Sequence, residues 1–426
     1  MKKTIAVLAG LAGLAGVNAT AHAADRLVIH AGTLIAEPGK PARQRQSIIL
    51  EDKKIVAIQD GFVAGGTIVD LSDRVVIPGL IDMHVHVTGP VQIGEGSPTA
   101  WVAERRLTRA SKTVLFGASV AKKILRSGFT TVRNLGDPAS VAYDLRDAIR
   151  SGEVDGPRML VSEPQFALSG GDYDVSAFQA RPEFEPYLLN RGSCAGVEDC
   201  RRAVREEVKR GADVIKLRLS DLAAMDPRVK TAERPEELSA IIDTAHELGR
   251  RVAVHTAGVP AATRRAIAAG ADTIEHGPLD EGSIRDMAKA GTAFTATLAV
   301  YEWAKPLYKR LGITRDFLGD AQASVRAAHA AGVKIVFGTD LMPAAMNLPP
   351  IEFRLLTESG LSPAEALRAA TMNAAEALGL DKEIGSIAPG KAADIVALDA
   401  NPLDDIKAME KVSFVMRAGK IYRNRD

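Results

Sequence analysis

The chain has 426 residues, of which 46% are hydrophobic and 25% are charged, a composition typical of ordinary globular proteins. Its 54 lysines and arginines nearly balance 53 aspartates and glutamates, so the totals indicate no basic surface for nucleic acid. These values exclude a disordered chain, a collagen-like chain and a multispan membrane protein.

The N-terminal residues have the three-part pattern of a secretory signal peptide. Lys2 and Lys3 form a short positive region, an apolar run covers residues 5–17, and the small-x-small signal Ala-His-Ala occupies residues 21–23. The apolar run is too short to span the roughly 30 Å of a bilayer's hydrocarbon core. We therefore expect residues 1–23 to be removed and the mature protein to be periplasmic or secreted.

The two ends of the mature chain share a β-rich pattern. Short runs of Val, Ile and Leu, punctuated by Gly and Pro, cover residues 26–77. The same style returns near the C-terminus in GSIAPGKAADIVALD and VSFVMRAGKIYRN. Residues 24–79 and 381–426 are therefore predicted to form one small β-sandwich domain.

The middle of the chain, residues 80–380, alternates strand-like and helix-like runs. Stretches such as CRRAVREEVKRGAD have helical spacing and end at Gly. Regular alternation of this kind predicts parallel strands joined by helices. The fold class is therefore α/β, with a (β/α)8 TIM barrel. Its eight predicted strands are GLIDMHVHV, FTTVRNLG, RMLVSEP, VIKLRLS, VAVHTAG, TIEHGP, AFTATLAV and KIVFGTD.

The two cysteines, Cys194 and Cys200, stand close together just before a predicted helix. In an oxidising compartment this spacing favours a small disulfide loop, with two separate free thiols as the alternative. Metal binding by the pair is not expected, because no histidine or second cysteine pair lies nearby.

Metal-competent side chains stand near the ends of five predicted barrel strands. His84 and His86 share one face of the first strand, because residues i and i+2 of a strand point the same way. Functional residues of such barrels gather at the C-terminal ends of the strands. Six side chains are therefore predicted to converge on one site: His84, His86, Lys216, His255, His276 and Asp340.

The other histidines of the predicted mature chain provide a contrast. His246 and His329 lie in helical segments just before a terminating Gly, where an imidazole interacts favourably with the C-terminal end of the helix dipole. His30 lies in the β-rich N-terminal part. All three are interpreted as structural.

Lys216 needs a separate explanation, because an ammonium group has no acceptor and cannot bind a cation. One alternative is a salt bridge with a carboxylate. The other is a carbamate, formed with CO2, whose two oxygens could bridge two metal ions.

These motifs resemble the amidohydrolase superfamily, in particular its binuclear branch of prolidase-like dipeptidases, Xaa-Arg dipeptidases and ochratoxin amidases. The resemblance implies that His84, His86 and Asp340 bind the more buried metal and that His255 and His276 bind the more exposed one. Carboxylated Lys216 would bridge them; the mononuclear imidazolonepropionase and deaminase branches lack this lysine. The matching pieces cover nearly the whole mature chain in the expected order: VVIPGLIDMHVHV, GFTTVRNLGD, VIKLRLS, VAVHTAG, AIAAGADTIEHG, VFGTDL, AATMNAAEALGL and GSIAPGKAADIVALDANPL.

The hypothesis that follows is an exported amidohydrolase with two divalent metal ions, expected to be zinc. It would cleave a peptide-like amide bond, in a dipeptide, an N-acyl amino acid or an ochratoxin-type amide, by a metal-bridging hydroxide. Asp340 would accept the proton of that hydroxide and pass it to the leaving amine. Arg218, Asp137 and Asp172 are candidates for the substrate pocket.

The loops leave the substrate open. The stretch SGGDYD has Asp172 where many prolidase-like relatives carry a histidine, and KLRLSDLAAMDP lacks their glycine-rich continuation. A lactonase or organophosphate hydrolase on the same metals is the alternative enzyme. A third alternative is a non-catalytic periplasmic binding protein, and the complete set of six metal-competent side chains argues against it. A small-molecule substrate is the expected partner; nucleic acid and membrane are not, and a homo-oligomer is left open.

Overall fold

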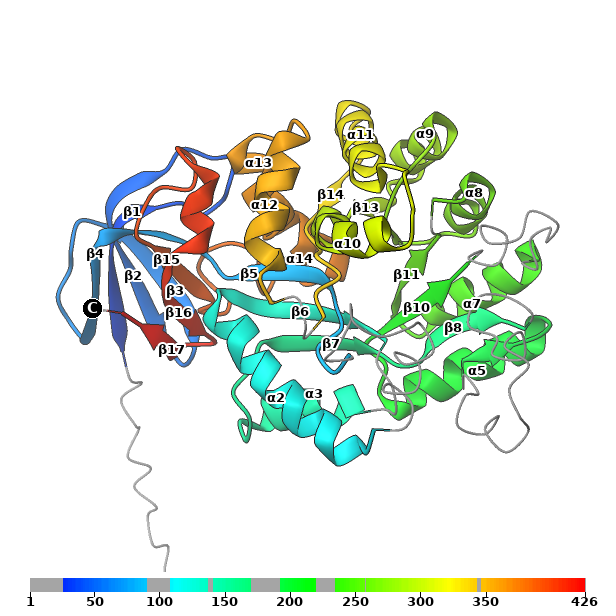
Figure 1. The fold of residues 1–426 in the computed structure, drawn as a ribbon. Coiled ribbons are helices and arrows are strands. Elements are labelled where there is room, and N and C mark those ends of the chain that lie inside the picture. Colours follow the sequence, from blue (N-terminus) through cyan, green and yellow to red (C-terminus); the bar gives the residue numbers. More distant parts are fainter. Residues whose placement is uncertain are drawn as a thin grey trace, which may run out of the picture.

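The structure is a computed structural model, and it describes residues 26–89, 108–136, 141–169, 192–219, 234–256, 258–342 and 346–425. The predicted signal peptide, Asp137 and Asp172 lie outside the described residues. Figure 1 shows two parts side by side, a sheet built from both ends of the chain and a barrel built from its middle.

Parallel strands fill the eight predicted barrel positions. After β7 the chain continues as β8 (Gln165–Leu168), which pairs with β10 and with the short β9 (Ser193–Cys194). Backbone hydrogen bonds from Met83 N to Phe337 O (2.9 Å) and from Asp340 N to His84 O (2.8 Å) join the last strand to the first. The eight strands are β5 (Leu80–Val85), β6 (Phe129–Leu135), β7 (Arg158–Ser162), β10 (Val214–Arg218), β11 (Arg251–His255), β12 (Thr273–Glu275), β13 (Ala293–Thr295) and β14 (Ile335–Val336).

Amphipathic helices cover the barrel because each has one apolar face. In α7, for example, the buried residues Leu238, Ile241, Ile242 and Ala245 recur at helical spacing. The helices are α2 (Ala110–Arg126), α3 (Val141–Ser151), α5 (Val197–Arg210), α7 (Pro235–Glu247), α8 (Pro260–Ala268), α9 (Glu281–Ala290), α10 (Leu298–Arg310), α11 (Phe317–Ala330), α12 (Leu348–Glu358), α13 (Pro363–Ala369) and α14 (Met372–Leu378). No helix in the described ranges is long and apolar enough to cross a membrane.

The seventh barrel strand is shorter than the run AFTATLAV predicted. The strand β13 ends at Thr295, and α10 begins at Leu298. Thr297 lies between them with a positive φ of 50°, which turns the chain. The apolar residues that follow belong to the start of α10, where Leu298 and Ala299 are buried, and periodicity alone does not separate a short buried helical segment from a buried strand.

Strands from both ends of the chain form one seven-stranded sheet, in the order β17-β16-β15-β4-β1-β2-β3. The pair β1–β4 is parallel and the other pairs are antiparallel. The sheet is curled, so that the start of β3 and the turn between β16 and β17 both reach Ala393, just before β15. Ala393 N donates to Lys53 O (3.0 Å), and Gly419 N donates to Ala393 O (3.1 Å). Its strands are β1 (Leu27–Leu34), β2 (Arg43–Glu51), β3 (Lys54–Asp60), β4 (Thr67–Pro78), β15 (Ile395–Leu398), β16 (Val412–Arg417) and β17 (Lys420–Asn424).

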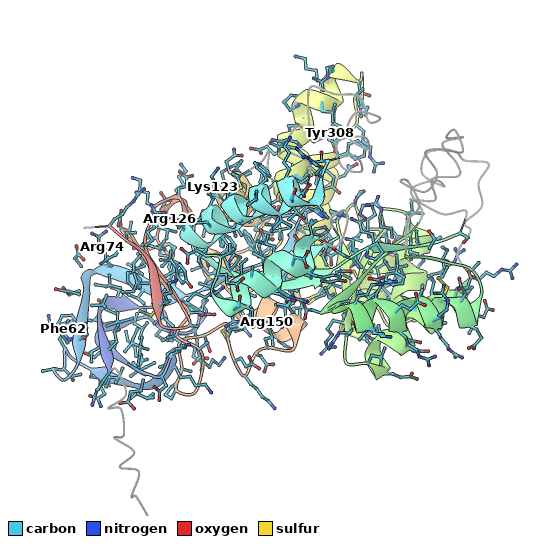
Figure 2. The ribbon with its side chains drawn as sticks, turned by 90° about the horizontal axis from the view of Figure 1, so that it is seen from below. Phe62, Arg74, Lys123, Arg126, Arg150 and Tyr308 are labelled. Atoms are coloured by element: carbon cyan, nitrogen blue, oxygen red, sulfur yellow. A yellow bond between two sulfur atoms is a disulfide. The ribbon has the colours of Figure 1, made fainter. Side chains whose placement is uncertain are left out.

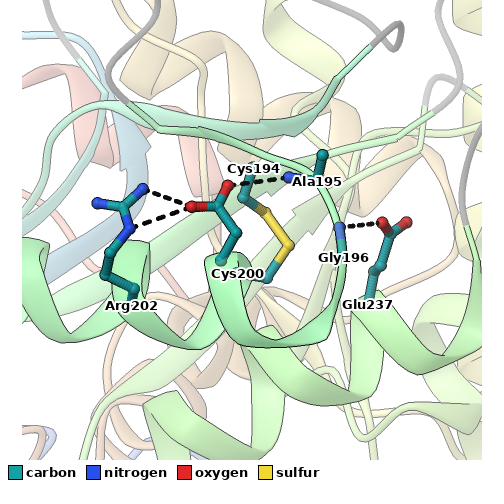
Figure 3. The surroundings of a disulfide bond; sticks show 7 residues. Cys194, Ala195, Gly196, Cys200, Arg202 and Glu237 are labelled. Atoms are coloured by element: carbon teal, nitrogen blue, oxygen red, sulfur yellow. Dashed lines mark hydrogen bonds and ion pairs between the residues drawn. A yellow bond between two sulfur atoms is a disulfide. The ribbon is translucent and has the colours of Figure 1, made fainter.

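A disulfide joins Cys194 of β9 to Cys200 in the first turn of α5, and both residues are buried (Figure 3). Two acidic side chains hold the backbone between them. Asp199 accepts a hydrogen bond from Ala195 N (3.1 Å), and Glu237 of α7 accepts one from Gly196 N (2.6 Å). The start of α5 is therefore tied to both the sheet and the neighbouring helix.

Candidate metal centre

Two histidines of the first barrel strand meet the aspartate that follows the last one. The Nε2 atoms of His84 and His86 lie 3.6 Å and 3.2 Å from Asp340 Oδ1. His84 is buried, whereas the side chain of His86 is 12% exposed. The barrel closes between β5 and β14, so these residues, 254 positions apart or more, occupy one corner of the rim.

The histidines of the fifth and sixth strands lie beside this corner. The ring of His276 stands 4.7 Å from that of His84 and 4.6 Å from that of His255, between centroids. Potential ligand atoms of His84, His276 and Asp340 all lie within 4.8 Å of one another. The structure therefore gathers all four predicted histidines and Asp340 into one cluster.

Lys216 lies in the middle of β10 and is almost completely buried, at 1% exposure. Among the described residues, no hydrogen-bond acceptor contacts its Nζ atom. Burial lowers the pKa of this amine to about 7, against the opposing charges of Glu275 and Asp340. The salt bridge considered from the sequence is absent from the described part of the chain, which leaves a buried amine that is largely uncharged above neutral pH.

The protonation states suit metal ligands. Burial, reinforced by the charge of Lys216, holds the pKa of His84 well below its usual value, and burial does the same for the pKa of His276 beside His255. Burial alone would raise the pKa of Asp340, but the hydrogen bond and charge of His86 hold it below its usual value. At neutral pH, His84 and His276 are therefore neutral imidazoles and Asp340 is a carboxylate, the forms that bind divalent metals.

A buried ion pair orients His84. Its Nδ1 lies 2.7 Å from Glu275 Oε2, and the other oxygen of Glu275 accepts a hydrogen bond from Arg133 Nη2 at 2.7 Å. Arg133 also donates to Met83 O (2.6 Å) and to Thr273 Oγ1 (3.0 Å). Because Glu275 accepts at Nδ1, the Nε2 atom of His84 is left facing Asp340.

A second buried carboxylate joins the first strand to the turn after the last. Asp82 accepts hydrogen bonds from His84 N (3.1 Å), Thr339 N (3.1 Å) and Thr339 Oγ1 (2.6 Å). Burial raises its pKa to about 7, and these hydrogen bonds act in the opposite direction. Gly338 permits the close approach of this turn, because a Cβ there would lie 2.3 Å from Thr295 Cγ2 and 3.1 Å from His84 Cβ.

Three residues at the rim have backbone in the left-handed region. His276, Thr297 and Asp340 have φ values of 69°, 50° and 56°. Such conformations cost a non-glycine residue about 1 kcal/mol or more and persist where the surroundings enforce them. Here Thr297 Oγ1 lies 2.7 Å from His276 Nδ1, and the backbone of Asp340 is bonded to that of His84. The strained residues are therefore the ones that aim or support the imidazoles.

Arg218 lies at the end of β10, half-buried, with Nη1 3.4 Å from Gln165 Oε1. Its charge contributes to the lowered pKa of Lys216, so it stands close to the cluster. A role in substrate binding stays a prediction for Arg218, and Asp137 and Asp172 lie outside the described residues.

The residues that orient the cluster were not identified from the sequence: Asp82, Arg133, Glu275, Thr297 and Thr339. A signal was present for three of them. Asp82 is two residues before His84 and therefore on its face, Glu275 directly precedes His276, and Arg133 is a charge inside an apolar strand. Nothing local marked Thr297 or Thr339.

The three described histidines outside this cluster have partners elsewhere. His246 Nε2 lies 2.8 Å from Asp272 Oδ2, and His329 Nε2 lies 3.0 Å from Glu365 Oε1, both in the last turn of a helix. His30 stacks on Phe62 with ring centroids 4.8 Å apart.

A parallel α/β barrel with imidazoles, a carboxylate and a buried lysine gathered at the C-terminal rim defines a class of barrel hydrolases. Comparison with known proteins gives the particular family. The model of the amidohydrolase family matches residues 75–422, so the chain belongs to the amidohydrolase family.

Individual relatives agree with this assignment. The chain is 28% identical to ochratoxinase of Aspergillus niger, over 96% of this chain and 88% of that protein. Among solved structures, a Xaa-Pro dipeptidase with methionine bound in its active site is 31% identical, with a TM-score of 0.82 over 94% of this chain and all of that one. The crystal structure of A. niger ochratoxinase is 26% identical, with a TM-score of 0.80 over 94% of this chain and 96% of that one. The protein is accordingly a hydrolase of amide bonds, metal-dependent by family.

Proposed function

We propose that the mature protein is an exported hydrolase of a peptide-like amide bond that holds two divalent metal ions, zinc by preference. The substrate class is a dipeptide, an N-acyl amino acid or an ochratoxin-type amide. The observation that carries the binuclear centre is Lys216, whose buried Nζ contacts no acceptor in the described residues and lies among metal-competent side chains.

The residues present fit such a centre. Neutral imidazoles and carboxylates are the usual donors for zinc, and such donors gathered at one buried site favour metal binding. His84, His86 and Asp340 would hold one ion, and His255 and His276 the other. Ligand atoms of His276 lie within 4.8 Å of those of His84 and Asp340, so the two proposed sets of ligands adjoin one another.

Lys216 would join the two ions after reaction with CO2. The neutral amine attacks the carbon of CO2, a C–N bond forms and one proton leaves, so that a carbamate anion replaces an uncharged amine. This change supplies two oxygens to the site and removes the buried group that lacks a partner. The low pKa of the amine keeps its lone pair available near neutral pH.

The chemistry of the bound metals is to lower the pKa of a water molecule and to polarise the scissile carbonyl. Asp340 would take the proton of the attacking water at its carboxylate and deliver it to the leaving amine. His86, 3.2 Å from Asp340, holds that carboxylate ionised beforehand. Arg218, at the end of the strand that carries Lys216, is proposed to bind the free carboxylate of the substrate.

The test combines metal analysis with a substrate panel. Metal-loaded wild-type protein should contain two equivalents of metal and hydrolyse members of a dipeptide and N-acyl amino acid library, with lactones as the comparison. Lys216→Ala should lose one or both metals, with activity partly restored by short carboxylic acids. Two retained metals and full activity in Lys216→Ala would disprove the carbamate, and turnover of lactones alone would replace the amide proposal.

Export is tested separately. Expression of the full chain in a Gram-negative host should yield a periplasmic protein whose N-terminus is Ala24. Recovery of the protein with Lys2 and Lys3 still attached would contradict cleavage.

A further inference from the structure

A cavity of about 260 Å³ opens between α10, α11 and the turn that joins them. Figure 2 shows this region projecting from the barrel, with Tyr308 labelled on α10. Its lining combines aromatic rings with cationic side chains: Tyr301, Tyr308, Phe317, Lys305, Lys309 and Arg315. Neither the metal cluster nor the packing of the barrel accounts for this combination.

The aromatic rings are arranged around Phe317, the first residue of α11. Tyr301 lies nearly parallel to it, with centroids 6.5 Å apart and an angle of 14° between the planes. Tyr308 is tilted against it at 5.2 Å. The three rings are half-buried, so each retains exposed surface beside the cavity. Flat aromatic surface of this kind favours a flat aromatic ligand.

The charges around the cavity are predominantly positive. Lys305 and Lys309 are exposed, one helical turn apart on α10, and have no ion pair within the ranges that the structure describes. The guanidinium of Arg315 stands 5.1 Å from the centre of the Phe317 ring and pairs with Asp320 at 2.8 Å. Asp316, the one acidic residue in the lining, accepts the hydrogen bond of Gly319 N (3.0 Å).

The cavity adjoins the metal centre through Tyr301. Its hydroxyl donates to Gly277 O (2.8 Å), the carbonyl directly after His276. The helix α10 starts after Thr297, whose hydroxyl contacts His276, and runs from there to the two lysines.

We propose that this cavity binds a planar aromatic group that carries a negative charge, as the part of the substrate remote from the scissile amide. Its assignment to the substrate rests on the proposed function, whereas its affinity for an aromatic anion does not. The rings select a flat group, and Lys305 and Lys309 select a negative one. A volume near 260 Å³ suits one aromatic ring system rather than a long peptide.

The binding test uses naphthalene-2-sulfonate, an aromatic anion that is a weak ligand for zinc. Calorimetric titration of the metal-loaded protein should show saturable binding, at least about tenfold weaker for neutral 2-naphthol and for ring-free ethanesulfonate. Lys305→Gln/Lys309→Gln and Phe317→Leu should each weaken the binding about five- to tenfold. Lack of binding, or unchanged binding in both variants, would overturn the proposal.

A matched control removes two charges elsewhere. Lys122 and Lys123 are exposed on α2, which lies across the barrel strands from α10 in Figure 1. Lys122→Gln/Lys123→Gln should bind naphthalene-2-sulfonate as the wild type does. An equal loss in this variant would show that net charge alone, rather than the cavity, attracts the anion.

Kinetics place the cavity in the substrate path. Pairs of amides with the same scissile bond, with and without a sulfonate on an aromatic ring, are compared with the ring on the acyl side and then on the amine side. When the ring is on the side of the amide that faces the cavity, the sulfonated substrate should have a lower KM than its unsulfonated partner. In Lys305→Gln/Lys309→Gln this difference in KM should disappear, while kcat stays the same. Binding of naphthalene-2-sulfonate without hydrolysis of any amide would contradict the proposed function but support the binding site. Hydrolysis of amides without this binding would support the proposed function but contradict the binding site.

Discussion

Asp340 combines two demands at one position. Its carboxylate faces His84 and His86, and its backbone, with φ of 56°, is bonded to that of His84. A carboxylate in a mostly buried position normally binds protons more readily, yet its imidazole neighbours keep this one ionised. The carboxylate is therefore ionised at neutral pH, which is the form that can accept a proton.

Asp340→Asn should lower kcat by about 10²- to 10⁴-fold, because an amide of the same shape cannot take up the proton. Turnover on the substrate found in the panel and the thermal unfolding midpoint are measured together. The midpoint should stay close to that of the wild type. Turnover near the wild-type value would exclude Asp340 as the proton acceptor.

Glu275 acts through His84 rather than on the substrate. Glu275→Gln keeps the side-chain shape but removes the negative charge that holds His84 Nδ1 and compensates buried Arg133. Metal affinity should fall about 10- to 100-fold, the usual effect of losing a partner of a metal-binding histidine. Competition with a chelator measures it, with Glu281→Gln, an exposed change on α9, as the control. Equal affinities in both variants would show that His84 does not need Glu275.

At the residue scale, the candidate ligands were predictable and their supports were not. His84, His86, His255 and His276 follow apolar strand runs, and the strand periodicity alone places them at one rim. Arg133 and Thr273 support His84 through Glu275, but they lie on strands two and six. Only closure of the barrel brings those strands near each other, and no local pattern records that contact.

Between elements, a buried carboxylate links α12 to α10. Glu352 accepts the backbone N–H of Ala299 (2.6 Å) in the first turn of α10, where helical N–H groups lack partners within the helix. Burial raises its pKa to about 8. This contact allows α10 to begin at Leu298, where the sequence favoured a continuing strand, because the capping group comes from a helix some fifty residues away.

Glu352→Gln should stabilise the protein at high pH. With a folded pKa of about 8 and an ordinary unfolded value near 4.5, the stability contributed by protonated Glu352 is lost as the pH rises between these values. Glutamine can still accept the hydrogen bond of Ala299 without that loss. The variant's gain in unfolding free energy over the wild type, measured by denaturant unfolding, should be small at pH 5 and reach about a few kcal/mol by pH 9.

The control for this pH dependence is Glu358→Gln. Glu358 is exposed, lies on the same helix and forms an ion pair with Arg354. Its difference from the wild type should not change with pH between 5 and 9. A flat difference for Glu352→Gln as well would show that Glu352 is ionised throughout.

At the scale of the whole molecule, the terminal sheet is attached to the barrel by buried polar contacts. Asp394, just before β15, accepts hydrogen bonds from Arg158 of β7 (2.8 Å) and from Ala418 N (2.7 Å). Its carbonyl also accepts a hydrogen bond from the N–H of Gly79 (2.9 Å), the residue between β4 of the sheet and β5 of the barrel. The sheet therefore braces the strand that carries His84.

Asp394→Ala should cost about 2 kcal/mol of unfolding free energy, because Ala418 N loses its acceptor and Arg158 keeps only its bond to Thr131 Oγ1. Arg158 is 29% exposed and can be hydrated, which keeps the cost below that of a fully buried pair. Asp399→Ala, which removes the exposed partner of Arg74, should cost less than about 1 kcal/mol. Thermal unfolding should remain one transition; two transitions with only one shifted would show that sheet and barrel unfold independently.

The sequence alone determined the repeated strand–helix pattern, the β-rich ends and the strand positions of the metal-competent residues, because each depends on short-range periodicity and on side-chain chemistry. The three-dimensional contacts were needed to show that Lys216 is buried without an acceptor in the described residues, that Glu275 and Arg133 orient His84, and that α10 and α11 enclose an aromatic, cationic cavity. These features depend on contacts between segments far apart in the chain. Burial and pKa follow from such contacts, since both depend on everything packed around a group.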